Sequence, residues 1–126
     1  MRSLAVAIVL TGVWLALAAF AQSPDGDAVR GKALFVRRCG GCHALDRPME
    51  GPRLRGVYGR RAGSDGEFAY SEALKNAKIV WDADLLDRWL TDTDVLVSGN
   101  DMSFRVPDGD ERRDIIAYLR SLSDGS

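Results

Sequence analysis

Five consecutive residues decide the fold of this chain: Cys39-Gly40-Gly41-Cys42-His43. Two cysteines separated by two residues and followed at once by histidine form the spacing of a covalent c-type haem attachment site. On one helical turn, side chains three and four residues apart lie on the same face. Both thiols can therefore reach one edge of a porphyrin, and the imidazole can turn toward its iron. The motif predicts two thioether bonds and one axial iron ligand.

Three other uses of paired cysteines are weaker interpretations. A thioredoxin-like dithiol should lie near a βαβ pattern, and no strand pattern precedes or follows Cys39. A closed zinc site needs four ligands, usually cysteine and histidine, whereas the chain has two cysteines and one histidine. A structural disulfide is the simplest alternative in an exported protein, but the haem would use both cysteines.

The sequence also limits the second axial ligand of the iron. His43 is the only histidine, so two-histidine ligation within one chain is impossible. The remaining choices are a methionine, or water in an open site. Met49 follows His43 so closely that it would have to cross to the opposite haem face almost at once, whereas Met102 has enough chain before it to wrap round the ring. Met102 is therefore the expected ligand, and its alternative role is packing in the core.

The first 21 residues have the pattern of an export signal. Met1-Arg2 is a short positive start, Leu4 to Ala18 is nearly all apolar, and Ala19-Phe20-Ala21 has the small-x-small form that signal peptidase cuts after. We expect cleavage after Ala21, which leaves 22–126 as a single domain in the periplasm. An uncleaved N-terminal membrane anchor is the alternative, although the apolar run is short for a span of about 20 residues.

Helix signals appear at four places, and loops without strand alternation separate them. The first expected helix has Ser23 as its N-cap with Pro24 next, and it ends near Arg38. The second covers Ser71 to Asn76, the third starts at the N-cap Asp82, and the last runs from the N-cap Asp108 to about Leu122. Thr91 to Phe104 is expected to be a loop. The apolar stripe of the last helix should pack on the first helix at Gly31. The pattern predicts an all-α fold, with three to five helices and long loops wrapped around one covalent haem.

The charges are unevenly distributed along the chain. The formal net charge is −1, so nucleic-acid binding is not implied. From Arg30 to Arg61 there are nine Lys and Arg against two acids, whereas from Ala62 onward there are seven against 14. This distribution predicts a molecule that is basic around the haem attachment site and acidic in its second half. A solvated surface with no bearing on partners is the alternative interpretation.

Six segments, taken in order and at their spacing, carry a family resemblance. They are Gly31-x-x-x-Phe35-x-x-x-Cys39-Gly40-Gly41-Cys42-His43, Gly51-Pro52-x-Leu54-x-Gly56-Val57-Tyr58-Gly59-Arg60, Phe68-x-Tyr70-Ser71, Val80-Trp81, Met102-x-Phe104 and Ile116-Ala117-Tyr118-Leu119. Together they resemble the class I cytochrome c family, in its mitochondrial and small soluble bacterial form, over nearly all of the mature chain.

The resemblance implies a cytochrome c fold that holds one haem c. The implied contacts are thioether bonds at Cys39 and Cys42, axial iron ligation by His43 and Met102, a hydrogen bond from the His43 ring to the Pro52 carbonyl, and propionate contacts from Arg60, Tyr70 and Trp81. It also implies that Gly31 and Phe35 pack on Tyr118 and Leu119.

The chain departs from the family's usual pattern mainly around the methionine. Trp89 stands where relatives often have a tyrosine, and Leu74 replaces a polar residue of the haem pocket. Thr93 and Ser98 stand where prolines are usual, so a looser methionine loop is expected. Relatives carry lysines round the exposed haem edge at three positions that are here Asp94, Val95 and Asp101.

The expected function is that of a periplasmic one-electron carrier between donor and acceptor redox proteins, and not that of an enzyme. Ligation by His43 and Met102 would close both faces of the iron and leave no place for a substrate. We expect a monomer with no nucleic-acid partner and, once the signal is cleaved, no stable membrane insertion. One alternative is a dedicated electron-transfer subunit of a dehydrogenase or oxidase complex. Another is a haem enzyme or gas-binding protein with an open sixth site.

Overall fold

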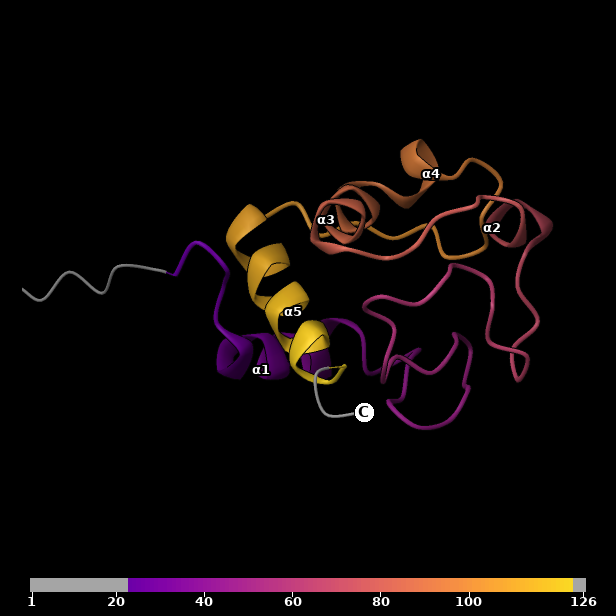
Figure 1. Cartoon of the computed structure of the whole chain (residues 1–126). Helices are drawn as coiled ribbons and strands as arrows, with labels where there is room; N and C mark the ends of the chain where they lie inside the picture. The colour runs from indigo at the N-terminus through magenta and orange to yellow at the C-terminus, as the bar shows by residue number, and fades with distance from the viewer. Residues whose placement is uncertain (1–22, 124–126) are drawn as a thin grey trace, which may run out of the picture.

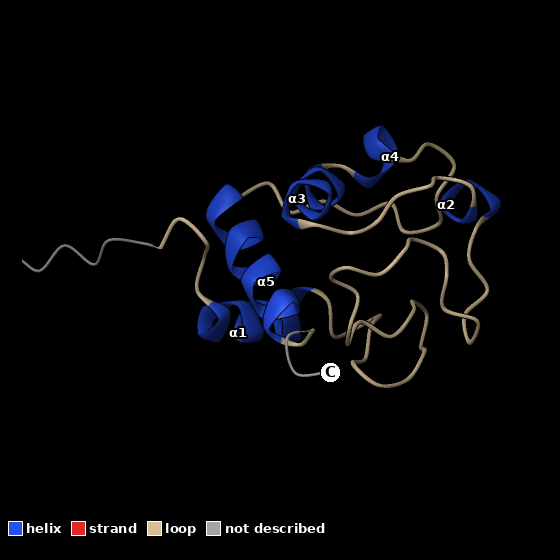
Figure 2. Cartoon of the chain, viewed as in Figure 1, coloured by secondary structure: helices blue, strands red, loops and turns tan. Residues whose placement is uncertain are grey.

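The computed structural model describes residues 23–123, so the predicted signal peptide at 1–21 lies outside the described residues. The helices are α1 (Ala28–Arg38), α2 (Glu72–Lys75), α3 (Ala83–Thr91), α4 (Thr93–Leu96) and α5 (Gly109–Ser121). In this range the only β pairing is a single bridge between Arg61 and Val80. Loops make up most of the remaining chain (Figure 2). The predicted all-α fold is confirmed.

Helices α1 and α5 cross in close contact at Gly31 (Figure 1). A Cβ at Gly31 would overlap the Asp114 carbonyl oxygen of α5 and lie 2.9 Å from the Tyr118 Cβ. The rings of Phe35 and Tyr118 meet edge to face, with their centroids 5.6 Å apart. The predicted packing of the last helix on Gly31 is therefore confirmed. This packing is possible because glycine has no side chain.

The predicted start of the first helix was wrong. Gly26 has a φ of +82°, so the chain turns after Ser23 instead of entering a helix. The carboxylate of Asp27 then accepts hydrogen bonds from the amides of Val29 and Arg30, at 2.8 and 3.0 Å. Asp27 is therefore the N-cap, and α1 begins at Ala28.

The segment from Thr91 to Phe104 is not entirely loop as predicted, because it contains α4. Asp92 ends α3, and its side chain then accepts hydrogen bonds from the amides of Asp94 and Val95. One aspartate therefore closes one helix and starts the next. The predicted caps Asp82 of α3 and Asp108 of α5 are confirmed. The short helix predicted over Ser71 to Asn76 forms as α2, with Ser71 as its N-cap.

Two walls face each other across the molecule (Figure 1). The long loop between α1 and α2 forms one wall, and α3 with the chain that follows it forms the other. The crossed pair of α1 and α5 joins the two walls at one end. No helix among residues 23–123 combines the length and apolar character needed to cross a membrane.

Candidate functional site

A cavity of about 440 Å³ lies between the two walls. All the residues predicted from the sequence to form the site line it: Cys39, Cys42, His43, Pro52, Arg60, Tyr70, Trp81 and Met102. Much of the remaining lining is apolar, including Leu54, Leu86 and Ile115. The volume is in the range of small-molecule and cofactor sites, about 300–1,000 Å³.

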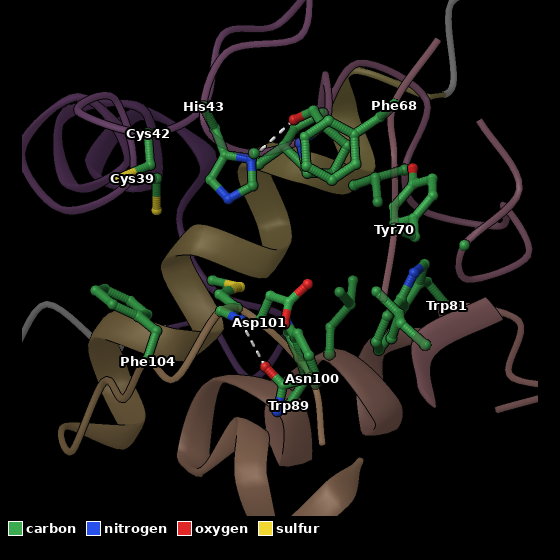
Figure 3. A pocket seen from close by; sticks show the side chains of 18 of the residues that line it. Cys39, Cys42, His43, Phe68, Tyr70, Trp81, Trp89, Asn100, Asp101 and Phe104 are labelled. Atoms are coloured by element: carbon green, nitrogen blue, oxygen red, sulfur yellow. Dashed lines mark hydrogen bonds between the residues drawn. The ribbon is translucent and has the colours of Figure 1, made fainter. Parts of the chain in front are cut away.

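The two cysteines lie at the end of α1, on the rim of the cavity (Figure 3). The Cys39 amide donates to the Phe35 carbonyl and so continues the helix by one residue. The Cys39 carbonyl then accepts from the amides of Cys42 and His43, at 3.1 and 2.9 Å, which closes a turn. The two cysteines do not form a disulfide with each other. Cys39 is buried, and burial raises the pKa of its thiol to about 11, whereas Cys42 is exposed.

His43 enters the cavity with its ring orientation fixed. Its Nδ1 lies 2.8 Å from the Pro52 carbonyl oxygen, which can only accept, so Nδ1 carries the proton. The unprotonated Nε2 then faces the cavity (Figure 3). Burial lowers the pKa of His43 despite the opposing effect of the Pro52 carbonyl, which favours the neutral, metal-binding form. A Cβ at Gly51 would lie 2.6 Å from Nδ1, so only glycine fits under the ring.

Met102 approaches the cavity from the wall opposite His43. Figure 3 shows its neighbours Asn100 and Asp101 across the cavity from the imidazole. The Met102 amide donates to the Asn100 side-chain oxygen at 2.8 Å, and the Asn100 amide group donates to the Val97 carbonyl at 2.9 Å. The methionine loop is thus closed around a buried asparagine. Met49, the alternative ligand, is 37% exposed and lies away from the cavity lining.

Thr93 holds the far end of the methionine loop. It is fully buried, with 0% of its surface exposed. Its hydroxyl accepts a hydrogen bond from the Phe104 amide at 2.9 Å, and its own amide donates to the Phe104 carbonyl at 3.4 Å. This pair of hydrogen bonds joins the two ends of the loop at Thr93, one of the two positions whose missing proline led us to expect a looser loop.

Arg60, Tyr70 and Trp81 line the cavity. Figure 3 shows Tyr70 and Trp81 on the side away from the cysteines. The Arg60 guanidinium donates to the Arg53 carbonyl at 2.9 Å, so a backbone oxygen helps to hold it in place. Burial raises the pKa of Tyr70, and Trp81 is buried with its ring 5.4 Å from that of Trp89. The site thus offers a cation, a phenol and an indole at one end of an apolar cavity.

Sequence reasoning missed a buried carboxylate behind Arg60. The side chain of Asp65 is 3% exposed, and its Oδ2 accepts from the Arg53 Nε at 2.7 Å. In the sequence, Ser64-Asp65-Gly66 has the chemistry of an ordinary surface turn. No local signal marks this aspartate as buried, because its burial depends on Arg53 from another part of the loop.

The residues present fit a covalent haem. Two thiols on one rim, an imidazole nitrogen facing inward and a methionine on the opposite wall are the donor set of c-type haem proteins with histidine and methionine ligands. The apolar lining suits a porphyrin, and Arg60 suits its carboxylates.

Comparisons with known proteins agree with this fit. The sequence model of the family "Cytochrome c" matches residues 28–123. Cytochrome c of Euglena viridis is 44% identical over 102 residues, which are 79% of this chain and 100% of that protein. Cytochrome c2 of Rhodopila globiformis is 41% identical over 104 residues, which are 80% of this chain and 98% of that protein.

Among solved structures, cytochrome cH from Methylobacterium extorquens superposes with a TM-score of 0.72 at 40% identity. The match covers 76% of this chain and 99% of that chain. Fold, cavity and sequence therefore agree. The chain belongs to the cytochrome c family, whose members are electron carriers that bind one covalent haem c with its iron.

Proposed function

We propose that this protein is a periplasmic one-electron carrier whose haem iron is ligated by His43 and Met102. The observation that carries the proposal is that both residues line one cavity, and that Asn100 and Asp101, the neighbours of Met102, lie across it from His43 (Figure 3). When bound, the haem supplies an iron that alternates between ferric and ferrous states. The chain would tether it through Cys39 and Cys42.

Hydrogen bonds to the backbone would keep both ligands in place during electron transfer. The Pro52 carbonyl fixes the His43 ring, and Asn100 fixes the backbone at Met102. If His43 and Met102 both ligate the iron, no ligand position would be left for a substrate, which supports a carrier over an enzyme. Histidine with methionine also favours a higher reduction potential than two nitrogen ligands.

The sequence before the described residues supports export. We propose that the chain is cleaved after Ala21 and that residues 22–126 act in the periplasm as one monomeric domain. The mass and N-terminal sequence of the purified protein would test this. A first residue of Gln22 agrees with cleavage, and an intact Met1 would contradict it.

Exposed acidic residues favour a second candidate, a dedicated electron-transfer subunit with a basic partner. Asp94 and Asp101 are exposed where relatives have lysines, and Val95 beside them is 82% exposed. A partner that docks here would need a basic surface with an apolar centre. Stable co-purification with one enzyme would support the subunit, whereas salt-sensitive exchange without co-purification supports a free carrier.

Replacing the proposed methionine ligand tests the main proposal. Met102→Ala should lower the reduction potential by more than about 59 mV, a tenfold change in the equilibrium constant of a one-electron couple. It should also let carbon monoxide bind rapidly to the reduced protein, because one iron face is opened. Met49→Ala is the control, and it should change neither property because Met49 lies away from the cavity lining. An unchanged potential in Met102→Ala would refute the ligand assignment.

A further inference from the structure

A buried anion lies directly behind the cation of the cavity. Asp65 Oδ2 is 2.7 Å from Arg53 Nε and 4.0 Å from the nearer Arg60 guanidinium nitrogen. Its other oxygen, Oδ1, accepts from the Glu67 amide at 3.2 Å. Arg60 lines the cavity, whereas Asp65 does not reach the lining. The Arg60 charge is therefore shared between the cavity on one side and a carboxylate on the other.

Asp65 carries its negative charge at neutral pH. Burial of its side chain acts to raise the pKa of the carboxyl group, but the Glu67 amide and the Arg53 guanidinium outweigh burial and hold the pKa below its usual value. A charge that is 3% exposed is screened by salt far less than a charge on the surface. Its field therefore extends into the adjacent apolar cavity.

We propose that Asp65 is a positioning residue that lowers the reduction potential by drawing the positive charge of Arg60 and Arg53 away from the haem propionates. The proposal rests on the proposed function and on the propionate contacts that the family resemblance implies for Arg60, Tyr70 and Trp81. Ferric haem carries one more positive charge than ferrous haem, so a negative charge near the haem stabilises the ferric form. Asp65 favours the ferric form directly, and it also weakens the cation that would offset the propionate charge. Both effects have the same sign.

Two substitutions at the same contact separate a charge effect from a structural one. Asp65→Asn and Arg53→Gln each remove one charge from the 2.7 Å contact. Asp65→Asn keeps the shape of the side chain, whereas Arg53→Gln shortens it, and both new side chains can still hydrogen-bond. If charge decides, Asp65→Asn raises the potential and Arg53→Gln lowers it. If the contact only braces the loop, both substitutions admit water and shift the potential in the same direction.

The expected change for each variant is several-fold in the ferric–ferrous equilibrium constant, where tenfold corresponds to about 59 mV. Glu67→Gln is the matched control. It removes a carboxylate from the same loop that also pairs with Arg53, at 3.4 Å, but this side chain is 62% exposed. Its shift should be a small fraction of the Asp65→Asn shift, because solvent screens it.

The measurement is spectroelectrochemical titration of the full haem-loaded protein at low ionic strength, wild type against the three variants. Opposite shifts for Asp65→Asn and Arg53→Gln support the proposal. Shifts in the same direction, or an Asp65→Asn shift no larger than that of Glu67→Gln, would overturn it. The far-red absorption band of methionine bound to ferric haem tests the ligand assignment separately, so a failure there is distinguishable from a failure at Asp65.

Discussion

At the scale of single residues, buried side chains that bond to backbone determine where the proposed ligands lie. The Pro52 carbonyl orients His43, the Asn100 amide group organises the turn before Met102, and the Thr93 hydroxyl holds Phe104 after it. Leaving one such buried group unpaired costs about 1–3 kcal/mol. Loss of any one of these contacts is therefore expected to disturb the position of a proposed ligand.

Thr93 gives the clearest test at this scale. Thr93→Val keeps the shape of the side chain but leaves the Phe104 amide without its acceptor, so the free energy of unfolding should fall by about 1–3 kcal/mol. The far-red band should also disappear at a lower denaturant concentration than in the wild type. Thr93→Ser retains the hydroxyl and is the control. Equal denaturation curves for the two variants would contradict the role given to the hydroxyl.

The sequence predicted residues whose chemistry has a fixed spacing, and it missed residues whose roles depend on the folded loop. Cysteine, histidine and methionine could be identified because haem attachment requires the first two at set intervals and the chain offers few alternatives. Asp65 and Thr93 look like ordinary turn and loop residues. Their burial follows from contacts with Arg53 and Phe104, which no local pattern encodes.

At the scale of helices, the N-caps predicted at Asp82 and Asp108 are confirmed, whereas the N-cap predicted at Ser23 was wrong. Asp27 caps α1 instead, and its amide also donates to the Asp114 carboxylate of α5 at 2.7 Å. This contact with a distant helix has no local sequence signal, so a pattern of capping residues alone could not place the start of α1.

The crossing of α1 and α5 depends on Gly31. Gly31→Ala would force the helices apart, because the new Cβ would overlap the Asp114 carbonyl oxygen. Overpacking of this kind costs about 1–3 kcal/mol, and the unfolding midpoint in denaturant should fall accordingly. Gly66→Ala is a matched control, because a Cβ there meets nothing within 4 Å. A Gly31→Ala midpoint equal to that of Gly66→Ala would show that the crossing tolerates a side chain.

At the scale of the whole molecule, the cavity is where the two walls and the crossed helices meet. Leu54 from the long loop, Leu86 from α3 and Ile115 from α5 all line it. A haem bound there would bury this apolar lining, and burial of apolar surface is the main force that stabilises a fold. The long loops and short helices are therefore expected to depend on the haem for their packing.

The central claim is that Met102 and His43 ligate the same iron from opposite sides of the cavity. The most direct measurement is the absorption spectrum of the purified oxidised protein, scanned for the weak far-red band of methionine sulfur bound to ferric haem. The account predicts that the band is present in the wild type and absent in Met102→Ala. A high-spin wild-type spectrum without the band would contradict the claim and would instead indicate an open site on the iron.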